Sequence, residues 1–136
     1  MRNARQFDAD VVLVSRLLEF YDPFPVLNLD ELEIRLLVPV VVSEPRFNDG
    51  NRPPLWDARR IAFFVEELWS GRRIDPIEVD ANCDRGHVYG PTLLDGHHRL
   101  CAAKIAAVEK IAVYYGGRLD VLNYLNGKRK NCPGDL

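Results

Sequence analysis

The sequence predicts an α/β fold, in which a single compact domain combines a small mixed sheet with several helices. Residues 55–70 carry apolar side chains at helical spacing, whereas residues 74–79 and 111–115 are short apolar segments typical of strands. An alanine-rich helical segment, residues 97–110, lies between the two strands. The chain has 136 residues, of which 47% are hydrophobic and 28% charged. This length and composition predict one hydrophobic core, and we expect one domain over residues 1–127.

The first 45 residues are predicted to hold one helix and a short stretch of sheet. Val11, Val14 and Leu18 recur at helical spacing, so residues 10–21 are expected to form a helix. Residues 25–29 are a candidate short strand. From residue 31 to residue 36 apolar and charged side chains alternate, which predicts a half-buried strand. A proline at position 39 should end that strand, with residues 40–42 continuing the sheet beyond it.

Residues 43–54 form the one long loop that the sequence predicts. The segment contains three prolines and an Asp-Gly pair, which are typical of loops. The favoured interpretation is an exposed connector. The alternative is a mobile lid that brings Arg46 or Arg52 to a ligand.

The remainder of the chain is predicted to alternate between helices and strands. The helix over residues 55–70 follows Pro54 and ends at Gly71, and its aromatic side chains are expected to lie in the core. The elements expected after it are a strand at 74–79, an extended segment at 87–95, a helix at 97–110, a strand at 111–115, a helix at 118–126 and a frayed tail at 128–136.

The candidate functional site is the junction Asp95-Gly96-His97-His98-Arg99, where an extended segment meets a helix. Gly96 allows a sharp turn and a close approach of a ligand to the main chain. The first turn of a helix offers unpaired N–H groups and a favourable dipole to an anion. The two histidines and Arg99 add donors suited to phosphate. The alternative is that Asp95 only caps the helix and both histidines are solvated.

The same junction carries a family resemblance. Residues 74–79 read Ile-Asp-Pro-Ile-Glu-Val, the box Asp95-Gly96-His97-His98-Arg99 opens an alanine-rich helix, and residues 111–113 read Ile-Ala-Val. In this order the segments resemble the ParB/sulfiredoxin superfamily, whose members carry a Pro-Ile-x-Val strand, a Gly-x-x-Arg box and a short strand. The matched part covers about residues 55–115 and implies a ParB/sulfiredoxin-like fold.

The resemblance implies that the box holds nucleotide phosphates. Gly96, His97, His98 and Arg99 would then surround a phosphate of ATP, ADP or CTP. Sulfiredoxins carry a cysteine where this chain has His97, so sulfiredoxin activity is not expected. The box is most similar to that of the free serine kinases, which implies a catalytic role for Asp95 as metal ligand or base, with Mg²⁺ and phosphoryl transfer or nucleotide hydrolysis. The candidates for a separate glutamate base are Glu31, Glu33 and Glu44.

Two other classes of function stay open. One is a non-enzymatic module that binds a protein partner or acts in regulation. The other is a zinc-stabilised domain, because Cys83 with His87 and His97 with Cys101 form two short-spaced pairs of metal-ligating residues. A two-metal nuclease is disfavoured, since the chain lacks clustered carboxylates.

Charge, hydropathy and cysteine content argue against further classes of protein. The formal net charge of −2 argues against a nucleic-acid partner, which usually selects a basic protein. The longest apolar runs are too short to span a bilayer, and no signal peptide is recognised. Three cysteines without a disulfide spacing indicate a reducing compartment, so we expect a cytoplasmic protein.

Overall fold

The computed structural model describes residues 9–24, 29–45, 55–81, 83–84, 87–88 and 91–134. The predictions for residues 25–28 and for the loop segment 46–54 therefore lie outside the described residues. The chain divides into two compact units. Unit 1 comprises Met1–Asp22, Asp75–His97 and Glu109–Leu136, and unit 2 comprises Pro23–Ile74 and His98–Val108. Within the described residues, no helix has the length and hydropathy that a membrane crossing requires.

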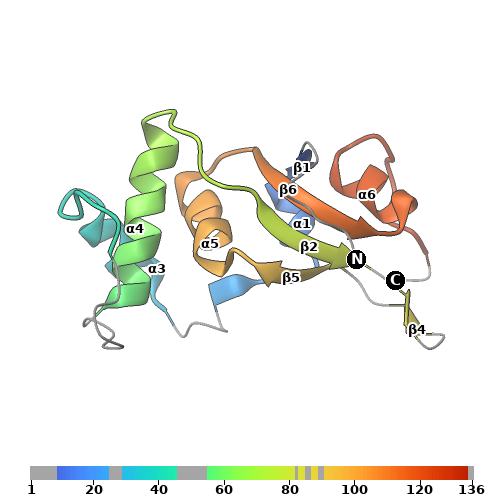
Figure 1. Cartoon of the computed structure of the whole chain (residues 1–136), viewed down its shortest axis with the longest axis horizontal. Helices are drawn as coiled ribbons and strands as arrows, with labels where there is room; N and C mark the ends of the chain where they lie inside the picture. Colours follow the sequence, from blue (N-terminus) through green and yellow to red (C-terminus); the bar gives the residue numbers. More distant parts are fainter. Residues whose placement is uncertain are drawn as a thin grey trace. The chain divides into compact units, whose positions relative to one another are not determined.

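Unit 1 is built on a four-stranded mixed sheet (Figure 1). Its strands, in spatial order, are β1 (Asp10–Leu13), β6 (Lys110–Gly117), β2 (Ile77–Ala81) and β5 (Thr92–Asp95). β6 pairs with β1 in antiparallel and with β2 in parallel orientation, and β2 pairs with β5 in antiparallel orientation. The predicted α/β class with a small mixed sheet is thus confirmed.

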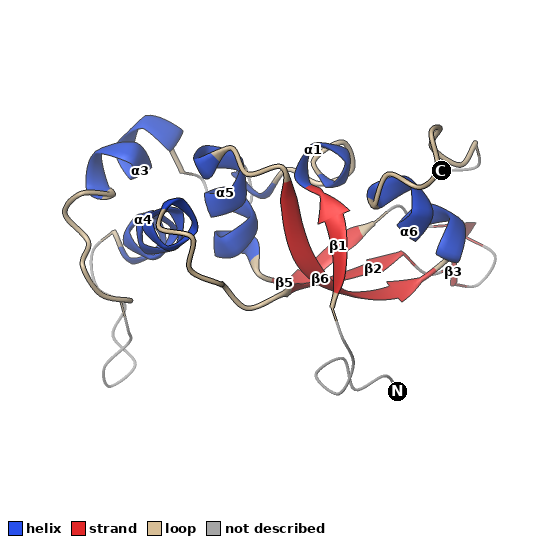
Figure 2. Ribbon diagram, turned by 90° about the horizontal axis from the view of Figure 1, so that it is seen from above, coloured by secondary structure: helices blue, strands red, loops and turns tan. Residues whose placement is uncertain are grey.

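One face of this sheet is buried. The register places Val12 opposite Ile111, Val79 opposite Leu93 and Val79 beside Tyr115, and all of these side chains are at most 6% exposed. Residues that alternate with them, such as Glu78 and Asp80, are half-buried. The helices α1 (Val14–Leu17) and α6 (Leu119–Leu125) lie on the same side of the sheet in Figure 2 and pack against β1. A separate two-stranded ribbon pairs β3 (Cys83–Asp84) with β4 (His87–Val88).

The helix expected over residues 10–21 is only partly correct. Its first four residues form β1, and the helix α1 begins at Val14, whose N–H donates to the Glu109 carbonyl at 2.9 Å. The periodicity of a short apolar run cannot distinguish a strand from a helix. Pairing with the distant strand β6 decides the conformation here.

The end of the chain is anchored as far as Asn131. The Arg16 guanidinium donates to the carbonyls of Tyr124 at 2.6 Å and Arg129 at 2.7 Å, and the Arg129 N–H donates to the Asn123 carbonyl at 2.8 Å. A further bond joins Arg129 Nε to the Asn131 carbonyl at 2.9 Å. Residues 128–131, predicted to fray, therefore carry hydrogen bonds both to the rest of unit 1 and among themselves.

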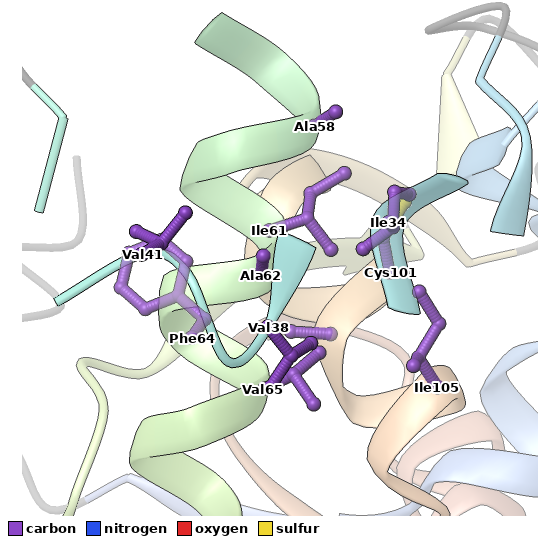
Figure 3. Packing of buried hydrophobic residues seen from close by; sticks show 11 residues of the cluster. Ile34, Val38, Val41, Ala58, Ile61, Ala62, Phe64, Val65, Cys101 and Ile105 are labelled. Atoms are coloured by element: carbon purple, nitrogen blue, oxygen red, sulfur yellow. The ribbon is translucent and has the colours of Figure 1, made fainter. Parts of the chain in front are cut away.

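Unit 2 is a cluster of helices. It contains α3 (Glu31–Leu37), α4 (Trp56–Trp69) and all of α5 (His97–Ala106) except its first residue. The predictions of helices over residues 55–70 and 97–110 are confirmed by α4 and α5, although α5 ends four residues early. Figure 3 shows the core of this unit, in which Ile61 and Val65 of α4 lie among Ile34 of α3 and Cys101 and Ile105 of α5.

The predicted strand over residues 31–36 is wrong, because this segment is the helix α3. The Asp30 carboxylate caps it by accepting from the Leu32 N–H at 3.0 Å. The buried residues Ile34, Val38 and Val41 follow a spacing of four and three, whereas Leu32 and Leu36, which created the apparent alternation, are 63% and 68% exposed. Residues 40–42 do not extend the sheet either, because the Val41 N–H donates to the Leu37 carbonyl at 3.0 Å.

Candidate functional site

The predicted junction is a strand followed directly by a helix. β5 ends at Asp95, α5 begins at His97, and Gly96 between them has φ of +102°. A Cβ atom at Gly96 would overlap Ile77 Cγ2 and would lie only 2.8 Å from Ile77 Cβ. The backbone of the junction thus packs directly on β2, and only glycine satisfies both the space and the dihedral angle. This arrangement orients the first N–H groups of α5.

His97 is held within unit 1. Its Nε2 atom lies 2.7 Å from the hydroxyl oxygen of Tyr21, and the two rings meet at 68° with centroids 5.6 Å apart. A phenol can donate to a neutral imidazole or accept from a charged one. The Tyr21 hydroxyl therefore fixes the orientation of the His97 ring without imposing a charge on it.

His98 is held within unit 2 by a charged partner. Its Nε2 atom lies 2.7 Å from Oδ1 of Asp57, in the first turn of α4. Both side chains are largely removed from solvent, with 19% of His98 and 23% of Asp57 exposed. The ring also meets the indole of Trp56 edge-on at 5.1 Å. The alternative of two solvated histidines is therefore wrong, because both rings are half-buried and both have a defined partner.

The two remaining side chains of the box are those of Asp95, before α5, and Arg99, within the first turn of α5. Asp95 is exposed at the end of β5, and its cross-strand partner is Glu78 on β2. The register shifts between Glu78 and Val79, so this pair lies at an irregularity of the ladder. Arg99 is half-buried in the first turn of α5. The box thus has one acidic residue, Asp95, before the helix and basic residues inside its first turn.

The glutamates considered as catalytic bases are placed on unit 2. Glu31 and Glu44 form ion pairs with arginines, Glu31 with Arg35 at 3.7 Å and Glu44 with Arg60 at 2.8 Å. Glu33 is an exposed residue of α3. The Arg60 guanidinium, held by Glu44, also lies over the Trp56 ring at 5.5 Å from its centroid.

The predicted zinc ligands are not gathered into a site by the residues that the structure describes. Cys101 is fully buried in the apolar core of unit 2, where it packs as a small hydrophobic residue. The side chains of Cys83 and His87 lie outside the described part of the chain. Among the described side chains, no group of three or more His, Cys, Asp or Glu residues is arranged to hold a metal ion.

Sequence reasoning missed the two residues that hold the histidines. Tyr21 and Asp57 are separated from their partners by 76 and 41 positions, and neither belongs to a motif with the box. The one local signal for Asp57 is an acidic residue in the first turn of a predicted helix, which is common in helices of every function. No protein-family model, curated protein or solved structure matches the chain.

Proposed function

We propose that the chain binds a phosphate group, that of a nucleotide, at the junction of β5 and α5. The observation that carries the proposal is the backbone at Gly96, where a left-handed glycine packed on Ile77 turns the chain into a ten-residue helix. The N–H groups of the first turn of a helix take no part in the intrahelical hydrogen bonds, and anions commonly bind to such groups. The dipole of the helix adds a favourable partial charge.

The side chains of the box support the same ligand. Arg99 supplies a planar guanidinium in the first turn, which suits the geometry of a phosphate. His97 and His98 each use Nε2 for a contact within the protein, so both imidazole rings have a defined orientation. Two oriented imidazoles and one guanidinium are a donor set typical of phosphate sites.

Asp95 gives the proposed site its chemistry. Mg²⁺ is usually held by one or two carboxylates together with phosphate oxygens, and Asp95 at the end of β5 would supply one carboxylate. Mg²⁺ bound there would neutralise phosphate charge. Asp95 would act as its ligand or as a base in phosphoryl transfer or nucleotide hydrolysis.

The test is a thermal-shift panel of ATP, ADP, CTP and GTP, with and without Mg²⁺, on the native protein and on Arg99→Ala. A ligand at one hundred times its dissociation constant adds about 2.7 kcal/mol to the free energy of unfolding. Loss of charged hydrogen bonds to phosphate should weaken binding at least about tenfold in Arg99→Ala. Arg59→Ala, which removes an exposed arginine of α4, is the control and should keep the native shift. Equal shifts in the native protein and Arg99→Ala would contradict the proposal.

A second candidate function, a module that binds another copy of itself, is favoured by the outer face of α3. Leu32 and Leu36, one turn apart, are 63% and 68% exposed, and Val40 and Val42 beyond the helix are 60% and 91% exposed. Several large exposed apolar residues within one segment are typical of interaction surfaces. Sedimentation equilibrium of the native protein and of Leu32→Asp/Leu36→Asp tests this function. A concentration-dependent dimer that the double variant loses would support it, and a monomer at every concentration would exclude it.

A further inference from the structure

The helix α6 ends on an Asn-Gly pair, and this pair is the only one in the sequence. Asparagine side chains are chemically labile. They lose their amide most readily before glycine, because no side chain then shields the next backbone nitrogen, which is the nucleophile. Asn126 is half-buried and Gly127 is exposed, so water reaches the pair. The pair Asn126-Gly127 is therefore a candidate site of spontaneous deamidation.

The folded backbone opposes this reaction. Ring closure requires the Gly127 nitrogen to lie beside Cβ of Asn126, from where it can reach Cγ. Asn126 has ψ of −1°, so the Gly127 nitrogen instead eclipses the backbone nitrogen of Asn126 and points away from Cβ. The Gly127 N–H also donates to the Tyr124 carbonyl at 3.2 Å, and Asn126 Oδ1 accepts from the Lys128 N–H at 3.0 Å. The reacting atoms thus stay apart until this turn opens.

Arg16, which belongs to α1, holds the turn closed. Its Nη1 atom donates to the carbonyls of Tyr124 at 2.6 Å and Arg129 at 2.7 Å, and its guanidinium lies over the Tyr124 ring at 4.4 Å from the centroid. The two carbonyls lie on either side of the Asn-Gly pair along the chain. The Tyr124 carbonyl is also the acceptor of the Gly127 N–H. A change of conformation at Asn126 would draw these carbonyls away from one arginine, so the Arg16 contacts oppose it.

We propose that Asn126 is a site of spontaneous deamidation and that Arg16 sets the rate of the reaction. When the turn opens, the Gly127 nitrogen bonds to Cγ of Asn126 and loses its proton, and Nδ2 leaves with a proton as ammonia. Water then hydrolyses the cyclic imide at either of its carbonyl groups, which leaves aspartate or isoaspartate at position 126. Water is the only other reactant. This inference does not depend on the phosphate site.

The two products have different consequences for the end of the chain. Aspartate keeps the backbone and an oxygen that can accept from the Lys128 N–H. In isoaspartate the main chain runs through the former side chain, which makes it one carbon atom longer. The bonds of Arg129 to Asn123 and to Arg16 depend on the present length of chain after Asn126. Isoaspartate should therefore release residues 128–131 from unit 1.

The experiment follows the full chain during incubation in mildly alkaline buffer, in which deamidation is accelerated by base. Peptide mapping by mass spectrometry measures the loss of the Asn126 amide and the amounts of aspartate and isoaspartate. The same chain unfolded in guanidinium chloride gives the rate without structure. We expect the native chain to react at least about tenfold more slowly than the unfolded chain, because several hydrogen bonds must open first.

Two variants and one further measurement assign the protection. Arg16→Ala should react about tenfold faster than the native chain, because it loses hydrogen bonds from a charged donor. Arg35→Ala removes a comparable bond, 3.1 Å from a guanidinium to the Ile105 carbonyl in unit 2, and should keep the native rate. Circular dichroism establishes that each variant is folded. Hydrogen exchange of the Gly127 amide in the native protein measures the same opening without a substitution, and its protection should match the slowing of deamidation.

Three results would overturn the inference. If the native chain and Arg16→Ala both keep the amide while the unfolded chain loses it completely, Asn126 is not a modification site of the folded protein. Equal rates in the native chain and in folded Arg16→Ala would refute the role of Arg16. Equal rates in the native and unfolded chains, or an unprotected Gly127 amide, would contradict the protection by the turn.

Discussion

Two neighbouring histidines of the same helix are held in different ways. His97, in unit 1, contacts the neutral hydroxyl of Tyr21, while His98, in unit 2, contacts the carboxylate of Asp57. Both contacts are 2.7 Å long, so geometry alone does not separate them. Their chemistry does, because a carboxylate stabilises the imidazolium and a phenol fixes only the ring orientation. The difference teaches that adjacent members of one motif can be held by partners of different charge from separate elements.

The largest effect is expected from Gly96→Ala, which disturbs the backbone that presents both histidines. The added methyl group would clash with Ile77, and the alanine would have to keep the positive φ of Gly96. The free energy of unfolding should therefore fall on the order of 2–4 kcal/mol. Urea denaturation measures this change. Gly71→Ala is the matched control, because Gly71 has φ of +74° but nothing within 4 Å, and it should cost about 1 kcal/mol. Equal costs for the two variants would refute the close packing of Gly96.

A smaller effect is expected from Asp57→Ala, which removes the charged partner of His98. The variant loses a charge-assisted hydrogen bond to His98 and an acidic residue in the first turn of α4, so it should be destabilised by about 1–3 kcal/mol at pH 6. A double-mutant cycle with His98→Ala isolates the pair from the helix effect. A coupling energy near zero would mean that the contact contributes nothing to stability.

The smallest effect is expected from Tyr21→Phe, which removes the neutral hydroxyl that contacts His97. One hydrogen bond to His97 is lost while the edge-to-face ring contact remains, so the cost should be about 0.5–1.5 kcal/mol. Urea denaturation measures this change. A cost as large as that of Asp57→Ala would contradict the difference between the charged and the neutral partner.

The sequence predicted those elements whose signal is local. The helix α4 was recognised from its apolar stripe, and β2, α5 and β6 from their order and composition. By contrast, β1 is a strand only because it pairs with β6, which lies about one hundred residues away. In α3 the exposed leucines imitated an alternating strand, and the helical spacing of Ile34, Val38 and Val41 was the better signal.

The candidate site shows the same limit. The box at residues 95–99 is a local pattern, and its glycine and helix start were expected from the sequence. The partners of its histidines come from elements 41 and 76 residues away, and no spacing rule links them to the box. Local chemistry could therefore suggest a ligand, but the partners that orient the histidines depend on tertiary structure.

The edge-on contact between Trp56 and His98 has an optical consequence. Imidazolium rings quench indole fluorescence more strongly than neutral imidazoles, so the emission of Trp56 depends on the charge of the ring 5.1 Å away. The second tryptophan, Trp69, ends the same helix and is 53% exposed, with its indole nitrogen donating to the Ala106 carbonyl at 3.2 Å. Replacement of Trp69 by phenylalanine would leave Trp56 as the one tryptophan. The intrinsic fluorescence of that variant would then depend on the charge of the His98 ring, and no added label would be needed.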